Sequence, residues 1–206
     1  MSSEPAAGGP QQWFEYYDDT VVGDPCSEAD HAFLAGLRAR AVARAWPCEA
    51  WDTFCDHDDE LGKRALKVGV WLDDPVRLKP LVAFGLVFDG DRIVGDRIDR
   101  EVPWSFQGLA EAQLEFSGPV DSLVERAGEW FESLLTWPIE YREWVDRNSD
   151  MVYHEWVLAN VGEKLLVNAS RMPARRPDRV ELIRGIRDEQ THGRKGIRGA
   201  WPWTRR

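Results

Sequence analysis

The hydrophobic residues of this 206-residue chain change their spacing near residue 66, and that change limits the folds that the chain can adopt. Before it, apolar residues recur at the spacing of one helix face, at Phe33, Leu34, Leu37, Ala41 and Ala45. Ser27 is well placed to cap this helix, and Pro47 is well placed to stop it. After it, short segments rich in Val, Ile, Leu and Phe alternate with Asp, Gly and Pro, which predicts antiparallel strands joined by tight turns.

The rest of the pattern completes the expected fold. Strands are predicted at 66–72, 81–88, 91–102, 113–116, 139–146, 151–159 and 164–167. A second helix should begin at Pro119 and end before Pro138, while 13–22 is a candidate edge strand and 52–60 an exposed acidic loop. Both element types are apolar on one face, so we predict an α+β fold: an antiparallel sheet of about six or seven strands, two amphipathic helices on one face of it, and a basic C-terminal tail.

Charge divides the chain into two parts. Residues 1–170 carry 32 Asp and Glu against 15 Lys and Arg, whereas residues 171–206 carry 4 against 11. The hydrophobic periodicity also stops near residue 170. We therefore expect a disordered leader at 1–12, a single α+β domain at 13–170, and a basic, Trp-containing tail at 171–206, in which 178–187 could form a short helix.

Tryptophan is unusually frequent, with 11 residues. Because burial is the default for aromatic residues at periodic positions, nine of them are expected to build much of the core. These nine are Trp13, Trp46, Trp51, Trp71, Trp104, Trp130, Trp137, Trp144 and Trp156. Trp201 and Trp203 lie in the basic tail and fall outside that expectation.

Several features favour a cytoplasmic protein that does not enter a membrane. The three Cys residues are odd in number, which is typical of reduced thiols rather than of a disulfide framework. Residues 1–10 have neither the basic nor the apolar region of a signal peptide. The longest apolar run, at 81–88, is far shorter than the roughly 20 residues that cross a bilayer.

The hairpin after the second helix contains the most specific pair of side chains. A turn at 148–149, or one of four residues at 147–150, places Glu143 opposite His154 and Tyr141 opposite Trp156. Glu143 and His154 are then the only ionisable pair on an otherwise apolar or aromatic face. A carboxylate and an imidazole with coupled pKa values could act as general acid and base, with Tyr141 and Trp156 lining the ligand site. The alternative is a structural pair at the margin of the sheet.

Other chemistry finds little support in the sequence. Cys48, Cys55 and His57 are ligand types for zinc, but the spacing of the two Cys residues fits none of the usual pairs, so no metal is expected. Nucleotide-binding loops and the sequence motifs of nucleophilic catalysis are not recognised, and we expect no cofactor.

The acidic body therefore leads us to expect an acidic cytosolic protein-interaction module, inhibitor-like or immunity-like, rather than an enzyme. Its partner would be a protein with a basic surface, bound through Glu125, Glu129 and Glu132 on the outer face of the second helix. Two alternatives stay open. The first is a small-molecule-binding protein or enzyme that uses Glu143 and His154. The second is nucleic-acid contact through the tail, whose Trp201 and Trp203 could instead anchor it to a partner or to the chain's own acidic body.

Overall fold

The computed structural model describes residues 12–15, 26–58, 65–99, 105–146, 149 and 151–185. The α-helices are α1 (Glu28–Arg44) and α2 (Val120–Leu135), and short 3-10 helices lie at Ala50–Asp52 and Ala110–Ala112. The strands are β1 (Thr53–Asp58), β2 (Ala65–Asp74), β3 (Lys79–Phe88), β4 (Arg92–Ile98), β5 (Leu114–Ser117), β6 (Ile139–Asp146), β7 (Met151–Leu158), β8 (Glu163–Val167) and β9 (Arg179–Arg184). The predicted α+β class, with two helices and antiparallel strands, is confirmed.

The strands form two antiparallel sheets, so the prediction of one sheet with six or seven strands is wrong. The first sheet has the order β1-β2-β3-β4-β5, and the second has the order β8-β7-β6-β9. The chain crosses from one to the other through α2, which follows β5 and precedes β6. Alternating hydrophobicity is the same whether neighbouring strands share one sheet or two, and for this reason the sequence pattern could not reveal the division.

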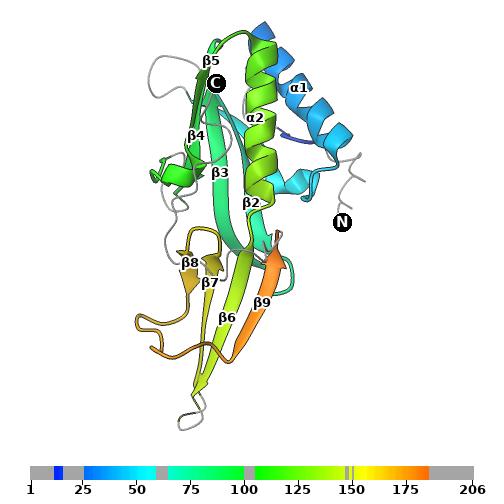
Figure 1. Ribbon diagram of the computed structural model, residues 1–206. Helices are drawn as coiled ribbons and strands as arrows, with labels where there is room; N and C mark the ends of the chain where they lie inside the picture. Colours follow the sequence, from blue (N-terminus) through cyan, green and yellow to red (C-terminus); the bar gives the residue numbers. More distant parts are fainter. Residues whose placement is uncertain are drawn as a thin grey trace, which may run out of the picture.

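The two helices lie side by side over one face of the first sheet, and the second sheet extends beyond their ends (Figure 1). Ser27 caps α1 as expected, in a capping box with Asp30. The helices approach closely because Gly36 and Gly128 have no side chain: a Cβ at Gly36 would meet Val124, and one at Gly128 would meet Arg40. Below them, the rings of Phe33 and Phe88 stack with centroids 4.4 Å apart.

Two strands form where the sequence predicted other structure. Thr53–Asp58 was expected to be an exposed acidic loop, but it pairs with β2 as β1 and buries Thr53 and Cys55. Arg179–Arg184 was a candidate short helix in the tail, but it pairs with β6 as β9. The folded chain therefore continues at least to Arg184. In the candidate edge strand 13–22, Trp13 and Phe14 form a turn, and residues 16–22 lie outside the described residues.

The core of the first sheet continues into the second. Ile139 and Leu158 of the β6–β7 hairpin are fully buried, and the ring of Trp137 meets Phe84 edge-on with centroids 5.7 Å apart. Arg97 of β4 also pairs with Glu163 of β8 at 2.9 Å. The seam between the sheets is thus packed by apolar side chains and linked by an ion pair.

The tryptophans fulfil most of the expected core role, with one clear exception. Trp46, Trp137, Trp144 and Trp156 are buried, whereas Trp51 is 62% exposed and its assignment to the core was wrong. Trp13, Trp71 and Trp130 are partly buried. Trp104, Trp201 and Trp203 lie outside the described residues. Neither α1 nor α2, nor any other helix in the described part of the chain, is long and apolar enough to cross a bilayer.

Candidate functional site

The register predicted for the last hairpin is confirmed. Glu143 pairs with His154 and Tyr141 with Trp156, as the turn at 148–149 required. Burial decreases along this face from the seam outward: Tyr141 and Trp156 are buried, Glu143 and His154 are half-buried, and the next pair, Val145 and Val152, is exposed. The candidate acid–base pair therefore lies where the hairpin leaves the core.

A turn of the first sheet covers the buried part of this face. Asp74, at the end of β2, is fully buried and accepts hydrogen bonds from the amides of Val76 and Arg77 and from the indole of Trp156. Burial raises the pKa of Asp74, but the hydrogen bonds from Trp156 and Arg77 outweigh it, and the pKa lies below its usual value. The guanidinium of Arg77 sits 3.7 Å from the ring centre of Tyr141 and binds Glu181 of β9 at 2.9 Å.

Glu143 and His154 are neighbours, but each is held mainly by an aromatic residue. The hydroxyl of Tyr141 donates to Glu143 at 2.8 Å, and the ring of His154 stands edge-on to Trp156 at 5.1 Å. Burial, and then the nearby carboxylate of Glu143, raise the pKa of Tyr141. Burial lowers the pKa of His154, against the attraction of Glu143. The burial therefore favours the neutral form of the imidazole.

The sequence did not reveal Asp74 and Arg77 as part of this cluster. Asp73, Asp74 and Pro75 read as an ordinary turn, and nothing in a local pattern shows which strand a turn will cover. The signal for β9 was present, because Arg179-Val180-Glu181-Leu182 alternates polar and apolar residues, but it stood within a segment of Pro, Gly and Arg.

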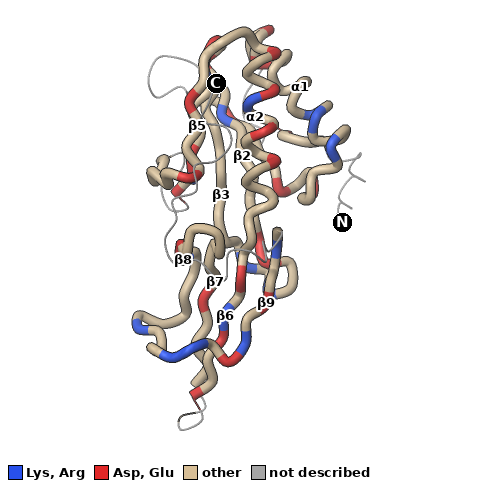
Figure 2. Tube along the Cα trace, viewed as in Figure 1, with Lys and Arg blue, Asp and Glu red and all other residues tan. Residues whose placement is uncertain are grey.

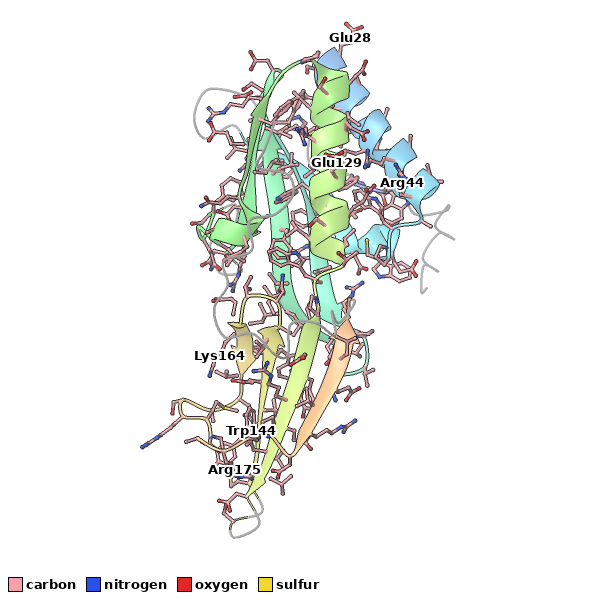
Figure 3. The ribbon with its side chains drawn as sticks, viewed as in Figure 1. Glu28, Arg44, Glu129, Trp144, Lys164 and Arg175 are labelled. Carbon is pink, nitrogen blue, oxygen red and sulfur yellow. The ribbon has the colours of Figure 1, made fainter. Side chains whose placement is uncertain are left out.

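The three acidic residues of α2 differ in their surroundings. Glu125 is exposed and pairs with Arg40, and Glu129 pairs with Arg126 of its own helix at 3.2 Å. Glu132 instead accepts both arms of the Arg40 guanidinium, at 2.7 and 2.8 Å, and is within 3.3 Å of the indole nitrogen of Trp46. The premise that all three line the outer face is thus wrong for Glu132, which ties α2 to α1. Figure 3 labels Glu129 on α2.

Negative charge is concentrated on the helices and the first sheet. The described residues from 12 to 138 include 19 Asp and Glu against 9 Lys and Arg, whereas those from 139 to 185 include 7 of each. Three of the basic residues of the second part, Arg171, Arg175 and Arg176, belong to the loop between β8 and β9, which Figure 2 shows at the lower end of the second sheet. The second sheet is therefore neutral and adjoins a strongly acidic unit.

Exposed aliphatic side chains have the opposite distribution. Of the ten large hydrophobic residues that stand out to solvent in the described chain, six belong to the second sheet. They are Val145, Met151, Val152, Val167, Val180 and Leu182. Neither of the two described α-helices covers this sheet in Figure 1. Exposed apolar residues gathered in one area are typical of an interaction surface.

The hollows of the described surface include three that bear on the site. One, of about 630 Å³, lies between the end of the β6–β7 hairpin and the loop that contains Arg171 and Arg175. Another, of about 800 Å³, lies at the seam of the two sheets, and a third, of about 500 Å³, lies beside β4. Glu143 and His154 line none of these three, so the enzyme alternative gains no substrate cavity from them.

The metal-ligand types of the sequence are used in other contacts. The thiol of Cys55 donates to the carbonyl of Phe14 at 3.1 Å, Nε2 of His57 is 3.6 Å from Oδ2 of Asp30, and Cys48 lines the seam hollow. Burial raises the pKa of both Cys48 and Cys55 to about 12. Within the described ranges, no three His, Cys, Asp or Glu side chains are arranged to hold a metal ion.

Comparison of the chain with protein-family models, with curated proteins and with solved structures finds no match in any of the three. A function must therefore be argued from the surfaces of the molecule.

Proposed function

We propose that this chain is a protein-interaction module that binds a partner with a basic surface through one face of its second sheet. The observation that carries the proposal is the contrast between this neutral sheet, which exposes Met151, Val167, Val180 and Leu182 on one face, and the acidic unit beside it. The apolar residues would supply the contact, and the acidic unit would attract the partner.

The contact face is the side of the second sheet opposite Tyr141 and Trp156. At its centre, Arg142 binds Glu140 at 3.0 Å and lies 3.6 Å from Glu155, which also pairs with Lys164 at 3.0 Å. Glu140 and Glu155 are themselves buried. Their carboxylates already have charged partners, so covering them with another protein removes less hydration than covering free carboxylates would.

Aliphatic residues flank these ion pairs on both sides. The register places Val180 beside Arg142 and Leu182 beside Glu140 on β9, and it places Val167 beside Glu155 on β8. Their exposed fractions are 44%, 39% and 40%. An apolar patch with charges paired at its centre is suited to forming a dry contact with another protein.

The acidic unit supports the choice of a basic partner. Exposed charges act over about 8 to 10 Å at physiological ionic strength, so 19 acidic against 9 basic residues attract a basic protein before contact. The exposed Glu125 and Glu129 are part of this field, although Glu125 also pairs with Arg40 of α1, and the more buried Glu132 holds the helices together.

Capture of proteins from a cytosolic extract of the native host at low salt tests the proposal. The full chain is immobilised beside two variants, Val180→Ser with Leu182→Ser, and Val42→Ser with Val76→Ser. Both variants remove two exposed aliphatic residues without changing charge, but only the first pair lies on the contact face. We expect the full chain and the control to retain the same basic protein, and the contact-face variant to retain at least tenfold less of it. Equal retention by all three, or retention of no basic protein by the full chain, would contradict the proposal.

A further inference from the structure

We propose that residues 186–206 of this chain dock in the hollow of about 800 Å³ at the seam of the two sheets, with Trp201 and Trp203 as anchors. The hollow lies between the end of α1, the β2–β3 turn and the end of β9. This inference does not depend on the proposed interaction with a partner, because it concerns a contact within one chain.

The chain enters the segment at the hollow itself. Ile183, Arg184 and Gly185, the last described residues, belong to the lining. Gly185 has a φ of 79°, and a Cβ at this position would meet the carbonyl of Trp137. Only glycine accommodates both this close approach and this turn without strain. The described chain therefore ends beside the hollow, at a point that the fold fixes.

Exposed apolar side chains stand at the rim. Trp51 is 62% exposed and Leu78 is 83% exposed, and both line the hollow together with Leu135. Leu78 also has a φ of 51°, a left-handed backbone conformation that is disfavoured for a residue other than glycine. Glycine or asparagine would suit that backbone better, so a leucine there presents an apolar side chain at a position that does not favour it.

The charges of the hollow and of the segment are opposite. Glu49, Asp52 and Asp73 line the hollow, and Arg184 lies 3.9 Å from Asp52. Residues 186–206 carry six Lys and Arg against two Asp and Glu, and end in Trp201-Pro202-Trp203-Thr204-Arg205-Arg206. Two tryptophans separated by a proline offer large apolar area at low entropic cost, and the arginines around them complement the carboxylates.

Length does not prevent the contact. Seventeen residues separate Gly185 from Trp203. An extended chain spans about 3.3 Å per residue, so the segment is long enough to return to the lining of the hollow. A segment joined by a short linker has an effective concentration in the millimolar range, so a weak contact suffices to fill the site. The chain's own segment therefore has an advantage over a separate peptide of the same sequence.

Photo-crosslinking within the full chain tests this proposal. Trp203 is replaced by the photoreactive p-benzoylphenylalanine, which keeps an aromatic side chain, and irradiated protein is digested and mapped by mass spectrometry. We expect intramolecular crosslinks to residues 46–52 and 75–78, with a yield that does not change over a hundredfold dilution. Crosslinks confined to other regions, the absence of crosslinks, or a yield that falls with dilution because a second copy supplies the segment, would each overturn the proposal.

A matched pair of variants tests whether the hollow makes the contact. Leu78→Ser and Val76→Ser change neighbouring residues of one turn that are 83% and 73% exposed, but only Leu78 lines the hollow. In the photoreactive chain, Leu78→Ser should reduce the crosslink yield to residues 46–52 at least fivefold, and Val76→Ser should leave it unchanged. Equal yields from the two variants would place the segment elsewhere. Matching far-ultraviolet circular dichroism spectra would show that both variants fold.

Discussion

The indole nitrogen of Trp156 donates a 2.8 Å hydrogen bond to the buried carboxylate of Asp74, and this contact joins the second sheet to the first. Asp74 also accepts a hydrogen bond from the guanidinium of Arg77, which stacks over the ring of Tyr141. One carboxylate thus orients the turn of one sheet on the aromatic face of the other. The position of the proposed contact face relative to the acidic unit depends on this junction.

Trp156→Phe should lower the free energy of unfolding by about 2 to 4 kcal/mol, because it removes a hydrogen bond to a charged acceptor and leaves a gap in the core. Trp144→Phe is the matched control. Trp144 is equally buried, but its indole donates at 2.8 Å to the neutral carbonyl of Arg175 (Figure 3), so its loss should cost less. Urea unfolding of both variants measures the difference. A larger loss in Trp144→Phe would contradict the role given to Asp74.

Asp74 should also make the free energy of unfolding depend on pH in the acid range. Its pKa lies below the usual value in the folded chain, so its contribution is fully present above the unfolded pKa of about 4 and is lost as pH falls through the folded pKa. Asp74→Asn should therefore lose less stability than the wild type between pH 5 and pH 2. Urea unfolding across this range checks the prediction, and parallel curves for the two proteins would refute it.

Removing the carboxylate of Glu132 and removing that of Glu129 should have very different effects on stability. Glu132→Ala removes both hydrogen bonds that Glu132 accepts from Arg40, whose side chain is only 10% exposed. It should lower the free energy of unfolding by about 1 to 3 kcal/mol. Glu129→Ala breaks an exposed pair on one helix and should cost about 0 to 0.5 kcal/mol. Thermal or urea unfolding of the two variants tests this. Similar losses would mean that the Arg40–Glu132 pair does not hold the helices together.

His154 should titrate below the ordinary histidine value of about 6.5, because its burial disfavours the charged ring. A histidine with a lowered folded pKa contributes stability that is present above its unfolded pKa and is lost as pH falls through the folded value. Two-dimensional NMR of the imidazole between pH 4.5 and pH 8 measures this pKa, and His154→Gln assigns the signal. A pKa above 6.5 would show that the attraction of Glu143 outweighs burial.

The sequence predicted those elements that depend on residues close together in the chain. The helix capped by Ser27 and the hairpin that pairs Glu143 with His154 follow from spacing and turn length, and both are confirmed. The division into two sheets was not predictable from the sequence. Which strands pair depends on contacts with segments far away in the chain, such as the contact of the β2–β3 turn with Tyr141. β1 was missed because Asp56, His57 and Asp58 conceal the buried Thr53 and Cys55.

The candidate surfaces show the same limit. Helical spacing correctly grouped Glu125, Glu129 and Glu132 on one helix, but it could not show that Glu132 meets Arg40 of the other helix. The contact face was not predicted at all, because Val180 and Leu182 belong to a segment whose basic composition suggested an unfolded tail. Trp201 and Trp203 lie outside the described residues, and their role stays a prediction.

The association and dissociation rates of the captured basic protein, measured against salt concentration on immobilised chain, test the central claim most directly. Glu125→Lys with Glu129→Lys should lower both the association rate and its dependence on salt, because these residues act through the long-range electrostatic attraction of the acidic unit. The dissociation rate should change little. Val180→Ser with Leu182→Ser should leave the association rate nearly unchanged and raise the dissociation rate at least tenfold, while Glu143→Gln should change neither. The account would be contradicted if the Val180→Ser, Leu182→Ser variant had the same dissociation rate as the wild type and if Glu143→Gln abolished binding or a catalytic turnover.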